Sequence, residues 1–222
     1  MSERRRRVRK QRSMWWSTAR TMGLSVLLVL LFRAFVAEAY VIPSGSMEPT
    51  LLVGDRLVVN NAAFGLRIPW TTRRLLDGRA PRRGEVVIFL DPKGSGETLI
   101  KRVVGVAGDT VSVRQGRLQV NGVPVARRFI GASPSGHVLP YEESLGGVTH
   151  RIYHLADRPG RDFAAFKVPP GHAFVMGDNR DDSNDSRYWG PLPYSHLKGK
   201  ALAVLWSFED GPRWERFFSA IR

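Results

Sequence analysis

Short apolar runs bounded by turn-forming residues recur along most of this chain, and they constrain its fold more than any other feature. Each run has four to eight residues that are apolar throughout or alternate with polar ones, which is typical of β-strands. The runs cover residues 56–60, 85–90, 98–104, 110–113, 117–120 and 201–208. Between them, Gln115-Gly116 and Asn121-Gly122 are hairpin turn signals. The sequence therefore predicts a mainly β, antiparallel fold, and 222 residues suffice for one domain with a lobe.

A change of composition divides the chain into a core and an inserted part. Residues 126–170 are rich in Gly, Pro and polar residues, as in "GASPSGH" and "ADRPGRD". The predicted units are a β core at 40–112 and 171–206, an inserted smaller β lobe at 113–170 and a C-terminal amphipathic tail at 207–222. The apolar residues of the tail have helical spacing, which favours a stripe packed on the core over a membrane-surface helix. They are Trp214, Phe217, Phe218 and Ile221.

An apolar segment near the N-terminus predicts a transmembrane helix. Its 17 residues, 21–37, reach the lower limit for crossing a bilayer. The basic run "RRRRVRK" precedes it, and such charge favours the cytoplasmic side of a membrane. We therefore predict a basic cytoplasmic tail at 1–19, one transmembrane anchor at 20–39 and an exported remainder. The alternative is a signal peptide cleaved after Ala37-Glu38-Ala39, and the sequence does not decide whether that site is cut.

Charge and residue content argue against several kinds of function. The net charge of +14 suits nucleic-acid binding, but much of the excess lies in the N-terminal basic run, where membrane topology explains it. The chain has no cysteine, which excludes disulfides, thiol nucleophiles and thiolate metal sites. Its five histidines lie in no catalytic or metal-binding motif, and we expect them at the surface or in the lobe. The stretch at 176–190 has Ser186 where an EF-hand requires Gly, and Leu192 follows where it requires Glu, which disfavours calcium.

Two short stretches hold candidate residues for hydrolytic chemistry. The tight turn Pro43-Ser44-Gly45-Ser46 exposes hydroxyls and backbone N–H groups, as a nucleophilic serine and its oxyanion site require, although such turns are also common in ordinary loops. Lys101 and Arg102 are expected on opposite faces of one apolar strand. A buried lysine has a lowered pKa and can accept a serine proton, whereas arginine cannot. The alternative is an edge strand on which both cations are solvated.

Four stretches, taken in order, resemble the bacterial type I signal peptidases, also called leader peptidases. They are "PSGSMEPTL", "GDRLVV", "KRVVGVAGD" and "GDNRDDSNDSR", within about residues 20–206. The resemblance implies that Ser46 is the nucleophile, Lys101 is the general base and Ser183 orients the lysine. It further implies an oxyanion hole made by the Ser44 hydroxyl and the Ser46 N–H. The other implied residues are a structural ion-pair loop of Asp178, Arg180, Asp185 and Arg187, and a substrate pocket of Ile42, Met47, Leu51, Ile88 and Ile100.

This resemblance implies a membrane-anchored serine endopeptidase that removes signal peptides from exported preproteins through an acyl-enzyme. It implies no metal or cofactor, preproteins and membrane lipids as partners, and no nucleic acid. The implied location is the bacterial inner membrane, with a single pass, a cytoplasmic N-terminus and the catalytic domain on the periplasmic side.

Two alternatives stay open at this point. One is a conjugative-transfer (pilin) maturation peptidase that uses the same Ser/Lys dyad. The other is a non-catalytic, membrane-tethered basic binding module, which predicts salt-sensitive binding to polyanions and indifference to Ser46→Ala. The sequence also leaves the oligomeric state and the preferred preproteins undecided.

Overall fold

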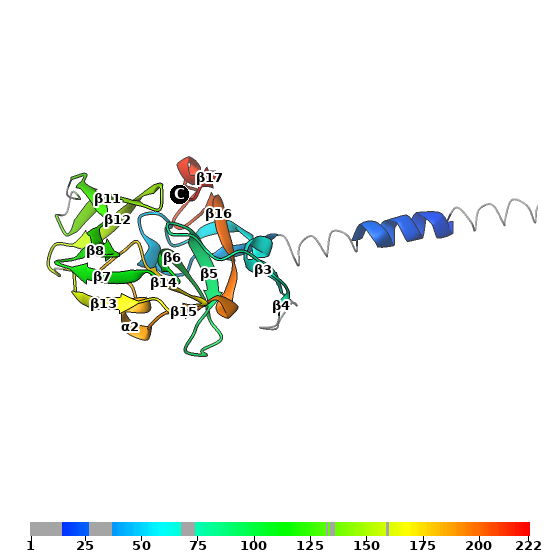
Figure 1. Ribbon diagram of the computed structural model, residues 1–222. Coiled ribbons are helices and arrows are strands. Elements are labelled where there is room, and N and C mark those ends of the chain that lie inside the picture. Colours follow the sequence, from blue (N-terminus) through cyan, green and yellow to red (C-terminus); the bar gives the residue numbers. More distant parts are fainter. Residues whose placement is uncertain (1–14, 27–36, 68–73, 132, 134–135, 159) are drawn as a thin grey trace, which may run out of the picture.

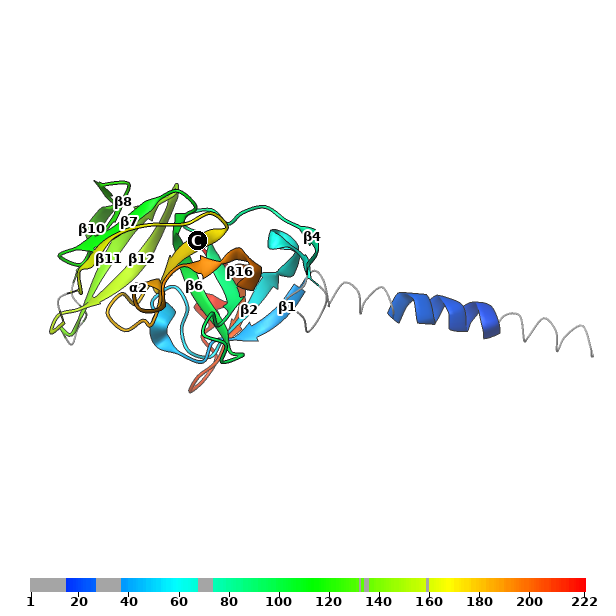
Figure 2. The same ribbon diagram turned by 60° about the horizontal axis from the view of Figure 1, so that its bottom comes forward.

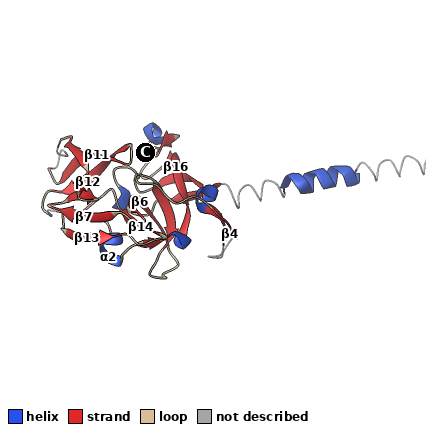
Figure 3. Ribbon diagram, in the orientation of Figure 1, coloured by secondary structure: helices blue, strands red, loops and turns tan. Residues whose placement is uncertain are grey.

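Strands dominate the computed structural model, which describes residues 15–26, 37–67, 74–131, 133, 136–158 and 160–222 (Figures 1 and 3). In the part of the chain that is described, they form one large sheet and three smaller ones. The paired strands of all four sheets run antiparallel. The prediction of a mainly β, antiparallel fold is thereby confirmed.

The first of the described residues, 15–26, form a helix whose residues are exposed. Among the described residues, no helix combines the length and the apolar character that crossing a bilayer requires. The predicted anchor at 20–39 includes residues 27–36, which lie outside the described residues, as does the basic run at 4–10. The last residues of that predicted anchor, 37–39, belong to a strand rather than to a helix.

The large sheet has the strand order β1-β2-β16-β5-β6-β14-β15, and β17 pairs with β16. Its strands are β1 (Ala37–Val41), β2 (Asp55–Asn60), β5 (Val86–Leu90), β6 (Thr98–Val106), β14 (His172–Met176), β15 (Leu192–Pro193), β16 (Leu197–Ser207) and β17 (Ser219–Ala220). Four of the predicted runs correspond to β2, β5, β6 and β16. This agreement follows from their continuous or alternating apolar pattern.

The smaller sheets are formed mostly by the middle of the chain. One contains β10 (Ala126–Phe129), β11 (Val138–Leu145) and β12 (Val148–Leu155); another contains β7 (Thr110–Arg114), β8 (Arg117–Val120), β9 (Val123–Pro124) and β13 (Phe163–Lys167); the third pairs β3 (Gly65–Arg67) with β4 (Arg74–Asp77). In Figures 1 and 2, β7, β8, β11 and β12 gather at one end of the molecule, beyond β6 and β14.

Helical structure in the described β region is limited to short turns. These are η1 (Gly45–Met47), η2 (Asn61–Phe64), α2 (Ser186–Trp189), η3 (Tyr194–His196) and η4 (Trp214–Arg216). Two of them contain residues of the predicted site: η1 contains Ser46, and α2 contains Arg187.

Both predicted hairpin turns are present. Gln115 and Gly116 join β7 to β8 with φ values of 51° and 67°, and Asn121 and Gly122 join β8 to β9 with φ values of 54° and 78°. Two consecutive positive φ values define the type I′ turn, whose twist matches that of paired strands.

The predicted helical stripe at the C-terminus is wrong. Instead of a helix, this segment forms the short turn η4 and the strand β17, which pairs with the edge of β16. Trp214 and Phe218 are 70% and 77% exposed, so they do not pack on the core, whereas Ile221 packs against a buried cluster. Helical spacing over so few residues does not distinguish a helix from a strand, and pairing with β16 decides the outcome here.

Apolar residues cover both faces of the centre of the large sheet. Along β5, Val86 and Ile88 belong to one buried cluster, while Val87 and Phe89 belong to another. A strand buried on both faces is continuously apolar, as this one is. Its neighbour β6 lies between β5 and β14, and residues 101–105 of β6 are buried. Both cations of β6, Lys101 and Arg102, are therefore buried.

Candidate active site

The turn that carries Ser46 is held by hydrogen bonds from a distant loop. Ser44 is extended, and the 3₁₀ turn η1 begins at the next residue. Asn179 donates from its backbone N to Ser46 O at 3.2 Å and from Nδ2 to Gly45 O at 3.2 Å. Met47 is fully buried and anchors the turn in the core. Ser46 itself is half-buried, so its hydroxyl is held at the edge of the core.

Lys101 on β6 lies against this hydroxyl. Its Nζ is 2.6 Å from Ser46 Oγ and donates to Ile100 O at 3.0 Å. The lysine is 4% exposed and Arg102 is 0% exposed. The alternative of an edge strand with two solvated cations is therefore wrong, because β6 is an interior strand buried on both faces.

The surroundings of Lys101 favour its neutral form. Burial lowers its pKa from 10.5 to about 8, and the carboxylates of Asp185 and Asp178 oppose that change. A lysine with this pKa has a substantial neutral fraction near pH 8, and a neutral amine can accept the proton of a hydroxyl within hydrogen-bond distance. The pair has the geometry of an activated serine nucleophile.

The other predicted site serines lie near the same turn. Ser44 Oγ is 3.5 Å from Ser46 Oγ. Ser183 is buried, and its Oγ has no hydrogen-bond partner among the described residues. A Cβ placed on Gly177 would lie closer than 3.0 Å both to Ser183 Oγ and to Ser46 O, so the two serines border the same glycine. The structure brings Ser44, Ser46 and Ser183 together, but no described hydrogen bond joins Ser183 to Lys101.

The four residues of the predicted ion-pair loop are all in ion pairs, two with each other and two with partners outside the loop. Asp185 pairs with Arg187 at 2.8 Å and accepts from Gly177 N at 3.0 Å, which closes the loop on itself. Asp178 pairs instead with Arg102 at 2.7 Å, and Arg180 pairs with Glu143. The loop is therefore tied to the large sheet on one side and to β11 on the other.

These buried pairs keep their carboxylates ionised. Burial opposes ionisation of Glu143, but Arg180 and His150 lower its pKa to about 2. Burial likewise opposes ionisation of Asp178, and Arg102 overcomes this effect, so its pKa is also below the ordinary value. Both carboxylates stay negatively charged at neutral pH.

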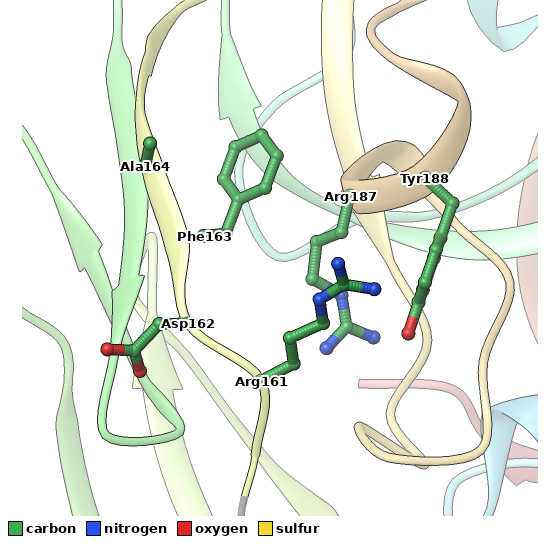
Figure 4. Close-up of a pocket in the computed structure, with 6 residues that line it drawn as sticks. All are labelled: Arg161, Asp162, Phe163, Ala164, Arg187 and Tyr188. Atoms are coloured by element: carbon green, nitrogen blue, oxygen red, sulfur yellow. The ribbon is translucent and has the colours of Figure 1, made fainter.

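The predicted pocket residues lie together around the serine turn. Ile42, Met47, Leu51 and Ile88 are buried in one cluster, against which Ile100 packs half-buried. A cavity of about 350 Å³ lies elsewhere, beside α2, and contains none of them (Figure 4). Its lining consists of Arg161, Asp162, Phe163, Ala164, Arg187 and Tyr188.

Sequence reasoning missed several residues that hold the site. Asn179 lies within "GDNRDDSNDSR", yet nothing in that pattern indicates that it binds the Ser46 turn. Thr50 donates to Asp178 Oδ2 at 2.5 Å, and Glu143 and His150 face the loop from the neighbouring hairpin. The histidines were expected at the surface or in the lobe, and His150 is buried on β12 within the predicted lobe. The only signal for this was its position in an alternating strand.

Comparison with known proteins identifies the family to which this chain belongs. Residues 15–206 match the family described as "Signal peptidase, peptidase S26". Signal peptidase I of Pseudomonas fluorescens is 41% identical over 199 residues, and that of Pseudomonas aeruginosa is 42% identical over 202 residues; each match covers 83% of this chain and 70% of the relative. A crystal structure of a signal peptidase I from Enterococcus faecalis V583 is 26% identical with a TM-score of 0.41, over 55% of this chain and 97% of that one. By the family match and the two relatives, the chain belongs to the signal peptidase family, peptidase S26.

Proposed function

We propose that this chain is a serine endopeptidase of the signal peptidase I type, which removes signal peptides from exported preproteins. The observation that carries the proposal is the 2.6 Å separation between Lys101 Nζ and Ser46 Oγ on a buried strand. Membership of the family supports the reaction class, and the pair of Ser46 and Lys101 supplies a nucleophile and a base for it. The family match also favours this function over a non-catalytic binding module.

In the proposed mechanism, the neutral amine of Lys101 accepts the proton of Ser46 Oγ while that oxygen attacks the peptide carbonyl. The resulting ammonium protonates the amine of the departing mature protein, and the C–N bond breaks. A water molecule then attacks the acyl-enzyme, and Lys101 again accepts the proton. Ser46 regains its hydrogen when the signal peptide leaves as a carboxylic acid.

The roles of the neighbouring serines follow from this mechanism. Two donors beside the nucleophile, the Ser44 hydroxyl and the Ser46 N–H, would stabilise the tetrahedral oxyanion. The position of Ser44 Oγ, 3.5 Å from Ser46 Oγ, supports the first of these roles. Ser183 would orient the Lys101 amine, and its buried hydroxyl without a partner supports that role. Asp178, Arg180, Asp185 and Arg187 would act structurally.

The substrate would bind as an extended strand beside the serine turn. The cluster of Ile42, Met47, Leu51, Ile88 and Ile100 adjoins this turn and would form shallow pockets for the small side chains at positions −1 and −3 of a signal peptide. We place the catalytic core at 40–112 and 171–206, with the inserted lobe between them. The apolar segment at 20–39 would anchor the chain in the bacterial inner membrane, with the basic tail at 1–19 in the cytoplasm.

The test is cleavage of a preprotein by the purified, detergent-solubilised full chain, with the product N-terminus read by mass spectrometry. Ser46→Ala and Lys101→Met are each expected to lower kcat by a factor of about 10³ or more, because each removes one of two residues that act together in catalysis. Ser144→Ala, which changes an exposed serine of β11, is the matched control and should cleave normally. Cleavage by Ser46→Ala at the wild-type rate would refute the proposal.

A further inference from the structure

The hairpin formed by β11 and β12 presents a pair of buried charged or polar side chains to the catalytic loop. Glu143 and His150 are directly opposite each other in the register of these strands. Their side chains are each 1% exposed, although polar side chains of this kind are seldom fully buried without a partner. This pair belongs to segment 113–170, to which the proposed mechanism gives no task.

His150 lies between two carboxylates that come from different parts of the fold. Its Nε2 is 3.4 Å from Glu143 Oε1 and 3.9 Å from Asp178 Oδ1. Neither ring nitrogen has a hydrogen-bond partner among the described residues. The ring is therefore held by packing and by the electrostatic field of the two carboxylates rather than by a close hydrogen bond. Because both carboxylates are ionised, an N–H directed toward them is favourable.

The charges around this imidazole balance only if every member stays in place. Asp178 accepts hydrogen bonds from Arg102 Nε at 2.8 Å and Arg102 Nη2 at 2.7 Å, and Glu143 accepts from Arg180 Nη1 at 3.0 Å. Two carboxylates thus face two guanidinium groups, with His150 between the two pairs. In a buried cluster of this kind, displacing one member leaves a charge unpaired, which is costly.

The cluster is connected to both residues of the proposed dyad. Arg102 follows Lys101 on β6, so its anchorage on Asp178 fixes the strand at the lysine. Tyr153 N on β12 donates to Asp178 O at 2.8 Å, and Arg180 N donates to Tyr153 O at 2.9 Å. Asn179, between these two loop residues, holds the Ser46 turn. The hairpin therefore touches the short segment on which the geometry of the serine and the lysine depends.

We infer that His150 is a positioning residue for the proposed reaction: from the β11–β12 hairpin it holds Asp178, and through Asp178 the strand and the loop that align Lys101 with Ser46. This inference rests on the proposed function and deepens it, since it gives segment 113–170 a part in catalysis. His150 does not contact the dyad, so its effect is on alignment and on the pKa of Lys101. Asp178 is one of the two carboxylates that hold that pKa up.

The experiment compares preprotein cleavage by His150→Phe, His150→Gln and His150→Asn in the full chain. Gln places an amide nitrogen near the position of Nε2, whereas Asn is too short to reach Asp178. We expect His150→Phe and His150→Asn to lower kcat at least tenfold with KM within twofold, and His150→Gln to recover most of the loss. The apparent pKa of kcat/KM should fall below the wild-type value in the impaired variants, because the field of Asp178 at Lys101 weakens.

A control separates alignment from simple loss of stability. Ile152→Val removes one methylene from a fully buried residue on the same strand and changes no charged or polar residue. It should lower the melting temperature and leave kcat and the pH profile unchanged. The inference is overturned if His150→Phe also lowers only the melting temperature and leaves kcat and the pH profile unchanged. It is overturned equally if His150→Asn and His150→Gln are equally active.

The outcome also separates this inference from the proposed function. If the wild-type chain cleaves a preprotein and Ser46→Ala does not, the proposed function stands, and normal kcat in His150→Phe and His150→Asn refutes only the positioning role. If the wild-type chain cleaves no preprotein, the proposed function itself fails. Should His150→Phe not fold, the comparison of the Gln and Asn variants still decides the question.

Discussion

Asp178 and Arg102 form a two-point ion pair in which both side chains are completely buried. Arg102 also donates to Gly84 O at 2.6 Å and to Arg222 O at 2.9 Å. The arginine thus connects the loop after β14, the entry to β5 and the last residue of the chain. Because it directly follows Lys101, the pair fixes β6 where the proposed base lies.

The first prediction concerns this pair. Asp178→Asn leaves the Arg102 guanidinium buried without a counter-charge, and we expect the free energy of unfolding to fall by about 3–5 kcal/mol. Urea denaturation followed by circular dichroism measures the change. Glu142→Gln breaks the exposed pair with Arg128 and is the control, for which we expect an unchanged midpoint. Equal midpoints for Asp178→Asn and the wild type would show that the pair does not stabilise the fold.

The second prediction is that the proposed base destabilises the protein. The pKa of Lys101 is about 8 in the folded state against an ordinary 10.5, so the unfolded chain binds more protons between these pH values. The buried lysine therefore lowers the free energy of unfolding by its full amount below about pH 8, and this effect disappears as the pH rises through 10.5. Lys101→Met should therefore raise the free energy of unfolding by about 3 kcal/mol near pH 7 and by progressively less at higher pH.

Denaturation at several pH values tests this prediction. Lys93→Met, which changes an exposed loop lysine, serves as the control and should show no pH-dependent difference from the wild type. A Lys101→Met protein that is less stable than the wild type at pH 7, or whose difference does not change with pH, would contradict the account of a lysine held partly neutral by burial.

The third prediction uses the glycine between the two serines. A Cβ on Gly177 would lie closer than 3.0 Å to Ser183 Oγ and to Ser46 O, so Gly177→Ala must change the positions of these atoms relative to residue 177. We expect a loss of kcat of about tenfold or more, since small misplacements in an active site have effects of this size. Gly211→Ala, where a Cβ meets nothing within 4 Å, is the matched control. Full activity of Gly177→Ala would mean that the geometry around the serine turn is not critical.

Local patterns were sufficient to predict the strands β2, β5, β6, β7, β8 and β16 and both hairpin turns. Continuous apolar residues on β5 and the hairpin dipeptide Asn121-Gly122 act through nearest neighbours, which a sequence displays directly. The C-terminal segment was predicted wrongly because its structure depends on the edge of β16. The predicted domain boundaries and site roles remain proposals.

The site was only partly visible in the sequence. A serine turn and a lysine on an apolar strand are ambiguous by themselves, and the resemblance to a family was needed to pair Ser46 with Lys101 across 55 positions. The residues that hold that pair in place were not predicted. Glu143 reaches Arg180 from a strand 37 positions away, and such a contact depends on tertiary packing that no local pattern encodes. The hydrogen bond from Asn179 to Gly45 depends on tertiary packing in the same way.

The measurement that tests the central claim most directly is the pH dependence of kcat/KM for preprotein cleavage, from about pH 6 to 10. If neutral Lys101 accepts the proton of Ser46, the rate constant rises with pH through an apparent pKa of about 8 and then levels off. A rate constant that is independent of pH over this range, or one that rises only around the ordinary lysine value of 10.5, would contradict the claim.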